Sequence, residues 1–149
     1  MSRTPYLIAL TLLICGCDPF AAMTTEIDEK VPSDKVGQID LLGSPEKLPA
    51  NAAQVQMYFL QFQDPVLRIR FRLPIREAEA FVVRYIGQPL QNGCHGLDEP
   101  SGKPTWWLRA CPPNARFAEQ IFSDNPPART AVIVPDGDFA TVWIYTFGT

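Results

Sequence analysis

Within residues 66–73, hydrophobic and charged residues alternate strictly from Leu67 to Leu73. Four apolar residues occupy one set of alternate positions: Leu67, Ile69, Phe71 and Leu73. Three arginines occupy the other set: Arg68, Arg70 and Arg72. A period of two with apolar residues on one side predicts a half-buried strand. A second strand is predicted just before it, over residues 54–63, which are rich in aromatic and β-favouring residues and end at Asp64-Pro65.

The pattern changes to a helical period after residue 73. Pro74 stands near the first position of a helix, and glutamates follow at 77 and 79, where they favour the positive end of the helix dipole. Apolar residues then recur every three to four positions as far as Ile86. Gly87 can cap this helix, and Pro89 prevents its continuation.

The remainder predicts a loop and a hairpin. Residues 88–113 are rich in Gly and Pro and contain Cys94 and Cys111. Residues 114–122 are expected to form a short second helix. A hairpin is predicted from strands at 130–134 and 139–147, because Asp-Gly within the turn at 135–138 favours a tight reversal.

These elements predict an α+β domain with a single antiparallel sheet of about four strands. Their order along the chain is strand, strand, helix, disulfide-closed loop, strand, strand. One main helix is expected to pack on one face of the sheet.

The first residues have the pattern of a secretory signal. Arg3 precedes an apolar run at 7–14, which is too short to span a bilayer, since a helix needs about 20 residues to do so. The sequence Ile14-Cys15-Gly16-Cys17 resembles the lipobox of bacterial lipoproteins: an aliphatic residue, then a small residue directly before the modified cysteine. Cys15 does not fit that cysteine position, because the bulky Ile14 precedes it.

The lipobox resemblance implies that residues 1–16 form a signal peptide and that Cys17 becomes an acylated N-terminus carrying palmitate or a similar chain. The protein would then be anchored in the lipid bilayer of the cell envelope and face the periplasm. Asp18 follows the modified cysteine and resembles the signal that retains lipoproteins in the inner membrane, so the inner membrane is favoured over the outer membrane.

Composition divides the rest into two parts. Residues 18–50 carry seven acids against three lysines and few large apolar residues, so residues 17–50 are expected to form a flexible acidic tether with a reach of roughly 30 Å. In an alternative interpretation, residues 38–42 dock on the domain as an edge strand. Residues 51–149 contain all three tryptophans and eight of the nine phenylalanines, and they are expected to form a single globular domain.

Two cysteines remain once Cys15 and Cys17 are assigned to the signal and the lipid. An even pair in an oxidising compartment predicts a disulfide between Cys94 and Cys111. The alternative is a metal site formed by these two cysteines and His95. Zinc normally takes four ligands, and His95 is the one histidine of the chain, so neither a metal nor another cofactor is expected.

Two features are candidate binding surfaces. The first is the stripe of Arg68, Arg70 and Arg72, whose guanidinium groups could grip carboxylates or phosphates; its alternative is a solvated sheet face with acidic partners. The second is the pair Trp106-Trp107, which would suit a protein or sugar contact if exposed, although at least one could be a core residue. The strand at 67–73, this pair and the aromatic strand at 141–147 together resemble small bacterial lipoproteins of uncharacterised function, and the resemblance implies a fold more than a role.

The function favoured by the sequence is a non-enzymatic protein-binding module, either an envelope accessory subunit or an inhibitor-like (immunity-type) protein, with an envelope protein as partner. The alternative is a binder of anionic envelope ligands, such as phospholipid, lipopolysaccharide or glycan. A hydrolase using His95 with Ser101 or Ser123 is a remote third class. Nucleic acid is not expected as a partner, because the chain after residue 16 carries sixteen acids and twelve bases.

Each function predicts a different surface. A protein binder should expose an apolar patch around Trp106 or Trp107. A ligand binder should present an unpaired row of arginines. An enzyme should hold His95 in a pocket beside a nucleophile.

Overall fold

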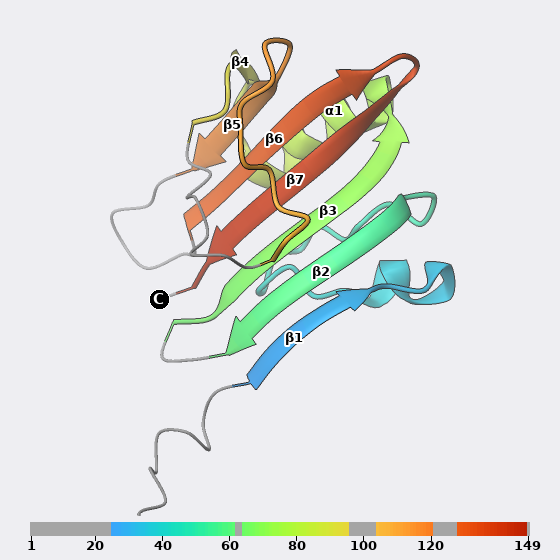
Figure 1. Ribbon diagram of the computed structural model, residues 1–149, viewed down its shortest axis with the longest axis vertical. Coiled ribbons are helices and arrows are strands. Elements are labelled where there is room, and N and C mark those ends of the chain that lie inside the picture. Colours follow the sequence, from blue (N-terminus) through green and yellow to red (C-terminus); the bar gives the residue numbers. More distant parts are fainter. Residues whose placement is uncertain (1–24, 62–63, 96–103, 121–127, 149) are drawn as a thin grey trace, which may run out of the picture.

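Seven strands form a single antiparallel sheet in the order β1-β2-β3-β7-β6-β5-β4 (Figure 1). The computed structural model describes residues 25–61, 64–95, 104–120 and 128–148. The strands have the following bounds: β1 Thr25–Lys30, β2 Ala53–Gln61, β3 Val66–Pro74, β4 Gln91–Asn92, β5 Arg116–Gln120, β6 Ala128–Asp136 and β7 Phe139–Phe147. Two helices are described, the 3-10 helix η2 (Ser33–Gln38) and the α-helix α1 (Ile75–Ile86).

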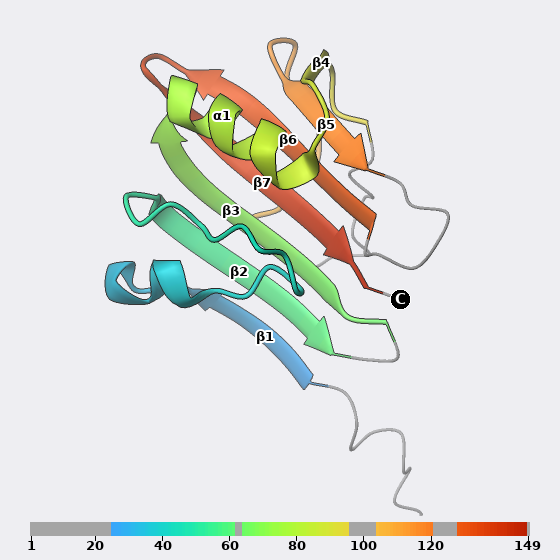
Figure 2. The same ribbon diagram turned by 180° about the vertical axis from the view of Figure 1, so that it is seen from behind.

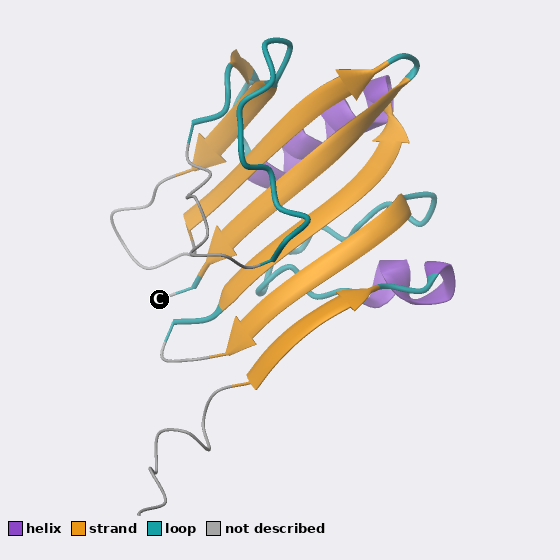
Figure 3. Cartoon of the chain, in the orientation of Figure 1, coloured by secondary structure: helices purple, strands orange, loops and turns teal. Residues whose placement is uncertain are grey.

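The expectation of about four strands in an α+β domain is therefore wrong, because the fold is mostly β, with seven strands and one short α-helix (Figure 3). The predicted central elements are present: β2, β3, α1 and the β6–β7 hairpin lie close to their expected residues. The additional strands are β1, β4 and β5. These segments show only weak alternation of apolar and polar residues. They form strands because their backbone groups pair with neighbouring strands.

The predicted helix at 114–122 is instead strand β5. Each of its residues pairs with β6, from Arg116 opposite Ile133 to Gln120 opposite Arg129. Ala118 is fully buried against the main core, while Phe117 belongs to a smaller cluster on the other side of the sheet. Pairing with a long neighbouring strand thus overrides the weak helical preference of this short segment.

The expected tether does not hold for its described part, residues 25–50. β1 pairs with β2 along its whole length, and the segment after it supplies several core side chains: Val31, Val36, Ile39, Leu41 and Leu48. Burying an apolar side chain of this size stabilises the fold by roughly 1.5–3 kcal/mol, which offsets the entropy cost of ordering the segment. The alternative of an edge strand at 38–42 is also wrong, since the edge strand lies at 25–30.

One face of the sheet carries the main core. α1 packs across β3, β7, β6 and β5, and the segment 31–52 lies beside it over β2 (Figure 2). The helix begins after Pro74 and ends at Gly87, whose φ of 76° is the left-handed conformation expected of a C-terminal cap. This helix and its capping glycine agree with the sequence prediction.

A buried polar group lies inside this core. The Tyr85 hydroxyl is 2.6 Å from Oγ1 of Thr146, and the guanidinium of Arg129 lies 5.3 Å from the centre of the Tyr85 ring. Burial raises the pKa of the Tyr85 phenol, while the hydrogen bond with Thr146 and the charge of Arg129 oppose that rise. The phenol therefore stays neutral and hydrogen-bonded across the usual pH range.

Candidate functional site

The arginine stripe and the tryptophan pair lie on the same face of the sheet, opposite α1. The alternation of β3 is confirmed, because Leu67, Ile69 and Phe71 are buried in the main core while the three arginines are half-buried on the other side. The segment 104–115 crosses this second face in front of the central strands (Figure 1). Two features that are 36 to 39 positions apart in the sequence are thereby brought into contact.

Arg68 lies among three aromatic rings. Its guanidinium carbon is 5.7 Å from the ring centre of Tyr58, 5.7 Å from that of Trp107 and 5.4 Å from that of Tyr145. The tyrosines are its cross-strand neighbours on β2 and β7. These cation–π contacts make Arg68 an internal support for the crossing segment.

The other two arginines are also engaged by the protein. Arg70 lies 5.9 Å from the ring centre of Trp106. Arg72 forms a 3.0 Å ion pair with Asp136 and lies 4.8 Å from the ring centre of Phe139. Each guanidinium group of the stripe thus already contacts an aromatic ring or a carboxylate of the protein.

Neither tryptophan forms an exposed apolar patch. Trp107 is 3% exposed. Trp106 is half-buried, and its Nε1 donates a 2.9 Å hydrogen bond to Asp28 of β1. The alternative that at least one tryptophan is a core residue is therefore correct for Trp107.

The predicted disulfide is present. Cys94 and Cys111 are bonded, with their Cα atoms 5.6 Å apart. Beside them, Leu108 and Ala115 pack with Phe117 and Val132 in a small second cluster. The bond thus fixes the crossing segment to the β4–β5 end of the sheet.

His95 is not held in a pocket. Its side chain is 70% exposed, and Nδ1 lies 2.9 Å from both carboxylate oxygens of Glu119. Ser101 and Ser123, the serines considered for a hydrolase, lie outside the described residues. Within the described ranges, no group of three or more His, Cys, Asp or Glu side chains is placed to hold a metal ion.

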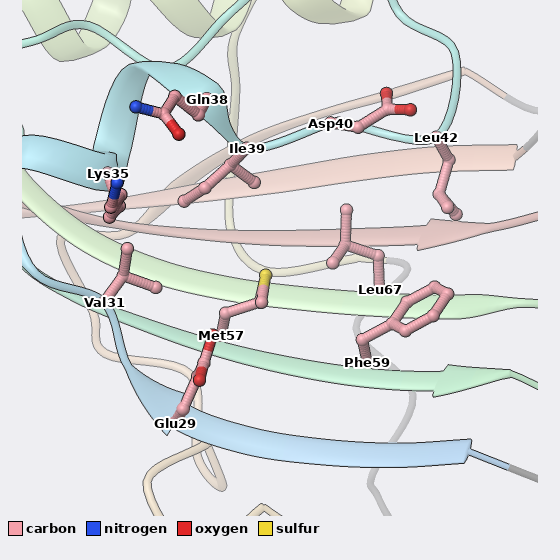
Figure 4. Close-up of a pocket in the computed structure, with 10 residues that line it drawn as sticks. All are labelled: Glu29, Val31, Lys35, Gln38, Ile39, Asp40, Leu42, Met57, Phe59 and Leu67. Atoms are coloured by element: carbon pink, nitrogen blue, oxygen red, sulfur yellow. The ribbon is translucent and has the colours of Figure 1, made fainter.

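A pocket of about 390 Å³ lies on the α1 side of the sheet, between β1–β3 and the segment that contains η2 (Figure 4). Its lower wall is the sheet, which contributes Met57, Phe59 and Leu67. Its upper wall is the η2 segment, from which Ile39 and Leu42 point down toward the sheet. The interior is thus apolar.

Local backbone geometry places the upper wall. The backbone N–H of Gly43 donates a 2.9 Å hydrogen bond to Oδ1 of Asp40, which closes a tight turn. Leu42, within this turn, has a φ of 51°, a left-handed conformation that leucine seldom adopts. The turn buries Leu41 completely while Leu42 remains partly exposed at the pocket. A strained backbone at this point indicates a wall that surrounding contacts hold in place.

Charged groups border the apolar interior. Glu29 of β1, Lys35 of η2 and Asp40 contribute to the lining. Figure 4 shows Glu29 rising from the edge strand beside Met57. A ligand that fills the pocket from this side would combine an apolar part with a positively charged part, because two of the three charges are negative.

The sequence prediction missed this pocket because its walls come largely from the expected tether. The signal was present in the recurring apolar residues of that segment, from Val31 to Leu48. The high proportion of acids and prolines in the segment favoured a flexible tether over a folded one.

Residues 1–24, which include Cys15, Cys17 and Asp18, lie outside the described residues. No helix in the described ranges is long and apolar enough to cross a bilayer.

Comparisons with protein-family models, with curated proteins and with solved structures find no match to this chain.

Proposed function

We propose that this chain is a lipid-anchored, periplasm-facing protein of the bacterial envelope that binds another envelope protein and is not an enzyme. It would act as an accessory subunit or an inhibitor-like (immunity-type) protein, acylated at Cys17 and retained in the inner membrane by Asp18. The lipobox-like Ile14–Cys17 sequence supports the anchor. The bond between Cys94 and Cys111 supports an oxidising compartment, where disulfides persist.

The observation that carries the binding function is the apolar pocket beside strand β1. Glu29 of the edge strand contributes to its lining, and Met57 and Phe59 inside it are only partly buried. Partly exposed large apolar side chains in a concave site are typical of surfaces that bind a partner.

The alternative of an anionic ligand at the arginine stripe receives less support. Arg68 and Arg70 stack against aromatic rings, and Arg72 is paired with Asp136. A phosphate or carboxylate would have to displace the segment that carries the tryptophans in order to reach two of the three guanidinium groups. The remote hydrolase alternative is not favoured either, because His95 is solvent-exposed and bound to Glu119.

Photo-crosslinking in cells tests the proposal. A benzophenone amino acid is placed at Met57 in the pocket, at Val83 on α1 and at Phe139 on the hairpin, the last two being the large apolar side chains most exposed in the described residues. We expect a discrete adduct with an envelope protein at Met57. If the adduct forms only at Val83 or Phe139, the proposed protein-binding function stands, but the binding site lies at that position and not at the pocket. Absence of an adduct at all three positions in folded, membrane-bound protein would overturn the function.

A further inference from the structure

We propose that the outer edge of β1 accepts an extended segment of the partner as an additional strand, and that the pocket takes a large apolar side chain from that segment. This inference rests on the proposed protein-binding function and names the mode of binding. The occupant is a strand that carries apolar and basic residues.

The edge of the sheet at β1 is available for pairing. β1 is the last strand of the sheet, and among the described residues it pairs with β2 alone. A strand in this position presents unpaired N–H and C=O groups along its outer side. Addition of a peptide strand to such an edge is a common mode of protein recognition.

The register identifies which residues offer these groups. The N–H of Val31 donates to the carbonyl of Val55 at 2.9 Å, so position 31 directs its main chain toward β2. Hydrogen-bonded and non-bonded pairs alternate along an antiparallel ladder. The main-chain groups of Asp28 and Lys30 therefore point outward, while those of Ile27 and Glu29 bond inward to β2.

Side-chain direction connects this edge with the pocket. Glu29 lines the pocket and shares its sheet face with Met57, its partner on β2. A residue of the added strand opposite Glu29 would project to the same face. It would form a non-hydrogen-bonded pair with Glu29 on that side, the kind in which side chains approach most closely. A long side chain there reaches the mouth of the pocket.

Charge selects the kind of strand. β1 carries three acids and one lysine and is therefore net negative, while Asp40 and Lys35 add one charge of each sign at the pocket. A second copy of β1 would place acids opposite acids, which is destabilising. A strand with lysine or arginine between its apolar residues is complementary.

The other edge of the sheet is less suitable. β4 has only two residues, and the disulfide at Cys94 follows two positions after its end. A short edge strand constrained in this way offers few main-chain groups to a partner.

Synthetic peptides test the inference on the whole folded protein. The probe is a capped peptide of alternating leucine, threonine and lysine, and its matched control has glutamate in place of every lysine. We expect the lysine peptide to bind and to shift the amide resonances of residues 26–30 and of Met57. The glutamate peptide should bind at least about tenfold more weakly, a difference of about 1.4 kcal/mol.

A pair of substitutions at Lys30 separates edge pairing from charge. Lys30→Pro removes an outward N–H, a change that edge strands tolerate, whereas Lys30→Thr removes the same charge and keeps the N–H. Edge pairing predicts at least about a tenfold loss of affinity for the proline variant and none for the threonine variant. If circular dichroism shows that Lys30→Pro does not fold, Glu29→Lys should give a similar loss, with Asp138→Lys as the control of equal charge change.

Three results would overturn the inference: equal binding of both peptides, full affinity of Lys30→Pro for the lysine peptide, or shifts confined to β4 and β5. A fourth result would also overturn it: palmitate displaces the peptide, and the peptide causes no change in the amide resonances of residues 26–30. The pocket would then be assigned to a lipid chain. None of these results would remove a protein adduct found at Val83 or Phe139, so the proposed function is tested separately.

Discussion

The indole N–H of Trp106 donates a 2.9 Å hydrogen bond to Asp28, a residue 78 positions earlier in the chain. This contact joins the loop closed by the disulfide between Cys94 and Cys111 to the edge strand β1. It runs across the face of the sheet opposite the pocket. The two faces of β1 therefore have different tasks: Asp28 holds the crossing segment, and Glu29 borders the pocket.

Removal of this contact should loosen the crossing segment. Asp28→Ala is expected to lower the free energy of unfolding by about 1 kcal/mol, the usual value of one hydrogen bond. It should also move the fluorescence emission of Trp106 to longer wavelength. Glu29→Ala is the matched control, because its side chain lies on the other face. An equal emission shift in both variants would contradict the assignment.

Arg68 should matter for stability more than an ordinary surface arginine. Its three aromatic neighbours predict a loss of about 1–2 kcal/mol in urea unfolding for Arg68→Gln. The control is Arg76→Gln, because Arg76 is exposed on α1. This substitution should change the free energy of unfolding by less than about 0.5 kcal/mol. Equal effects of the two substitutions would show that the ring contacts contribute nothing.

The disulfide should be a large contributor to stability. It joins residues 17 positions apart, and loss of such a bond typically costs about 2–5 kcal/mol in a small secreted domain. We expect reductant to lower the free energy of unfolding of the native protein by this amount, which is measured as a lower urea midpoint. The double variant Cys94→Ser/Cys111→Ser should start from the lower midpoint and be insensitive to reductant, and a reductant effect in that variant would point to another cause.

Tyr85 should make the free energy of unfolding decrease at alkaline pH. Its pKa in the folded state is raised above the ordinary value of 10.0, so the unfolded chain loses the phenol proton first. The contribution of Tyr85 is thus present in full below pH 10.0 and falls as the pH rises toward the folded-state pKa. Urea unfolding between about pH 8 and about pH 11 should show this fall. Tyr85→Phe should show a smaller one, and an identical slope in both proteins would refute the role of Tyr85.

The anchor can be tested by labelling with a fatty-acid probe. Cys17→Ser should abolish labelling and leave an unprocessed precursor. Cys15→Ser should be processed normally, because Gly16 and not Ile14 precedes the modified cysteine. Normal labelling of the Cys17 variant would remove the basis of the proposed location.

Strong local patterns made the central part of the fold predictable from the sequence. Three such patterns are visible in short stretches of sequence: the strict alternation at 67–73, the capped helix that ends before Gly87 and the Asp-Gly turn. The disulfide was predictable because only two cysteines remain outside the signal region.

Segments whose structure depends on distant partners were not predictable in the same way. β5 has five residues and owes its conformation to pairing with β6. β1 is acidic and only weakly alternating, and it becomes a strand because β2 pairs with it throughout. Composition assigned residues 25–50 to a tether, although the apolar side chains of that segment are enough to bury it.

The candidate site shows the same division. The sequence identified Arg68 and Trp107 as notable residues, but the contact between them arises only because the segment 104–115 crosses the sheet. The pocket was missed because one of its walls belongs to the η2 segment.

The early start of β1 has a consequence for where the domain works. Thr25 begins the strand eight positions after Cys17, and eight residues span at most about 29 Å when fully extended. With Cys17 acylated as proposed, the short chain between Cys17 and Thr25 would keep this edge of the sheet close to the lipid head groups. A partner would then have to bring its own segment down to the membrane surface, so the lipid would select partners by their height above the bilayer as well as by their sequence.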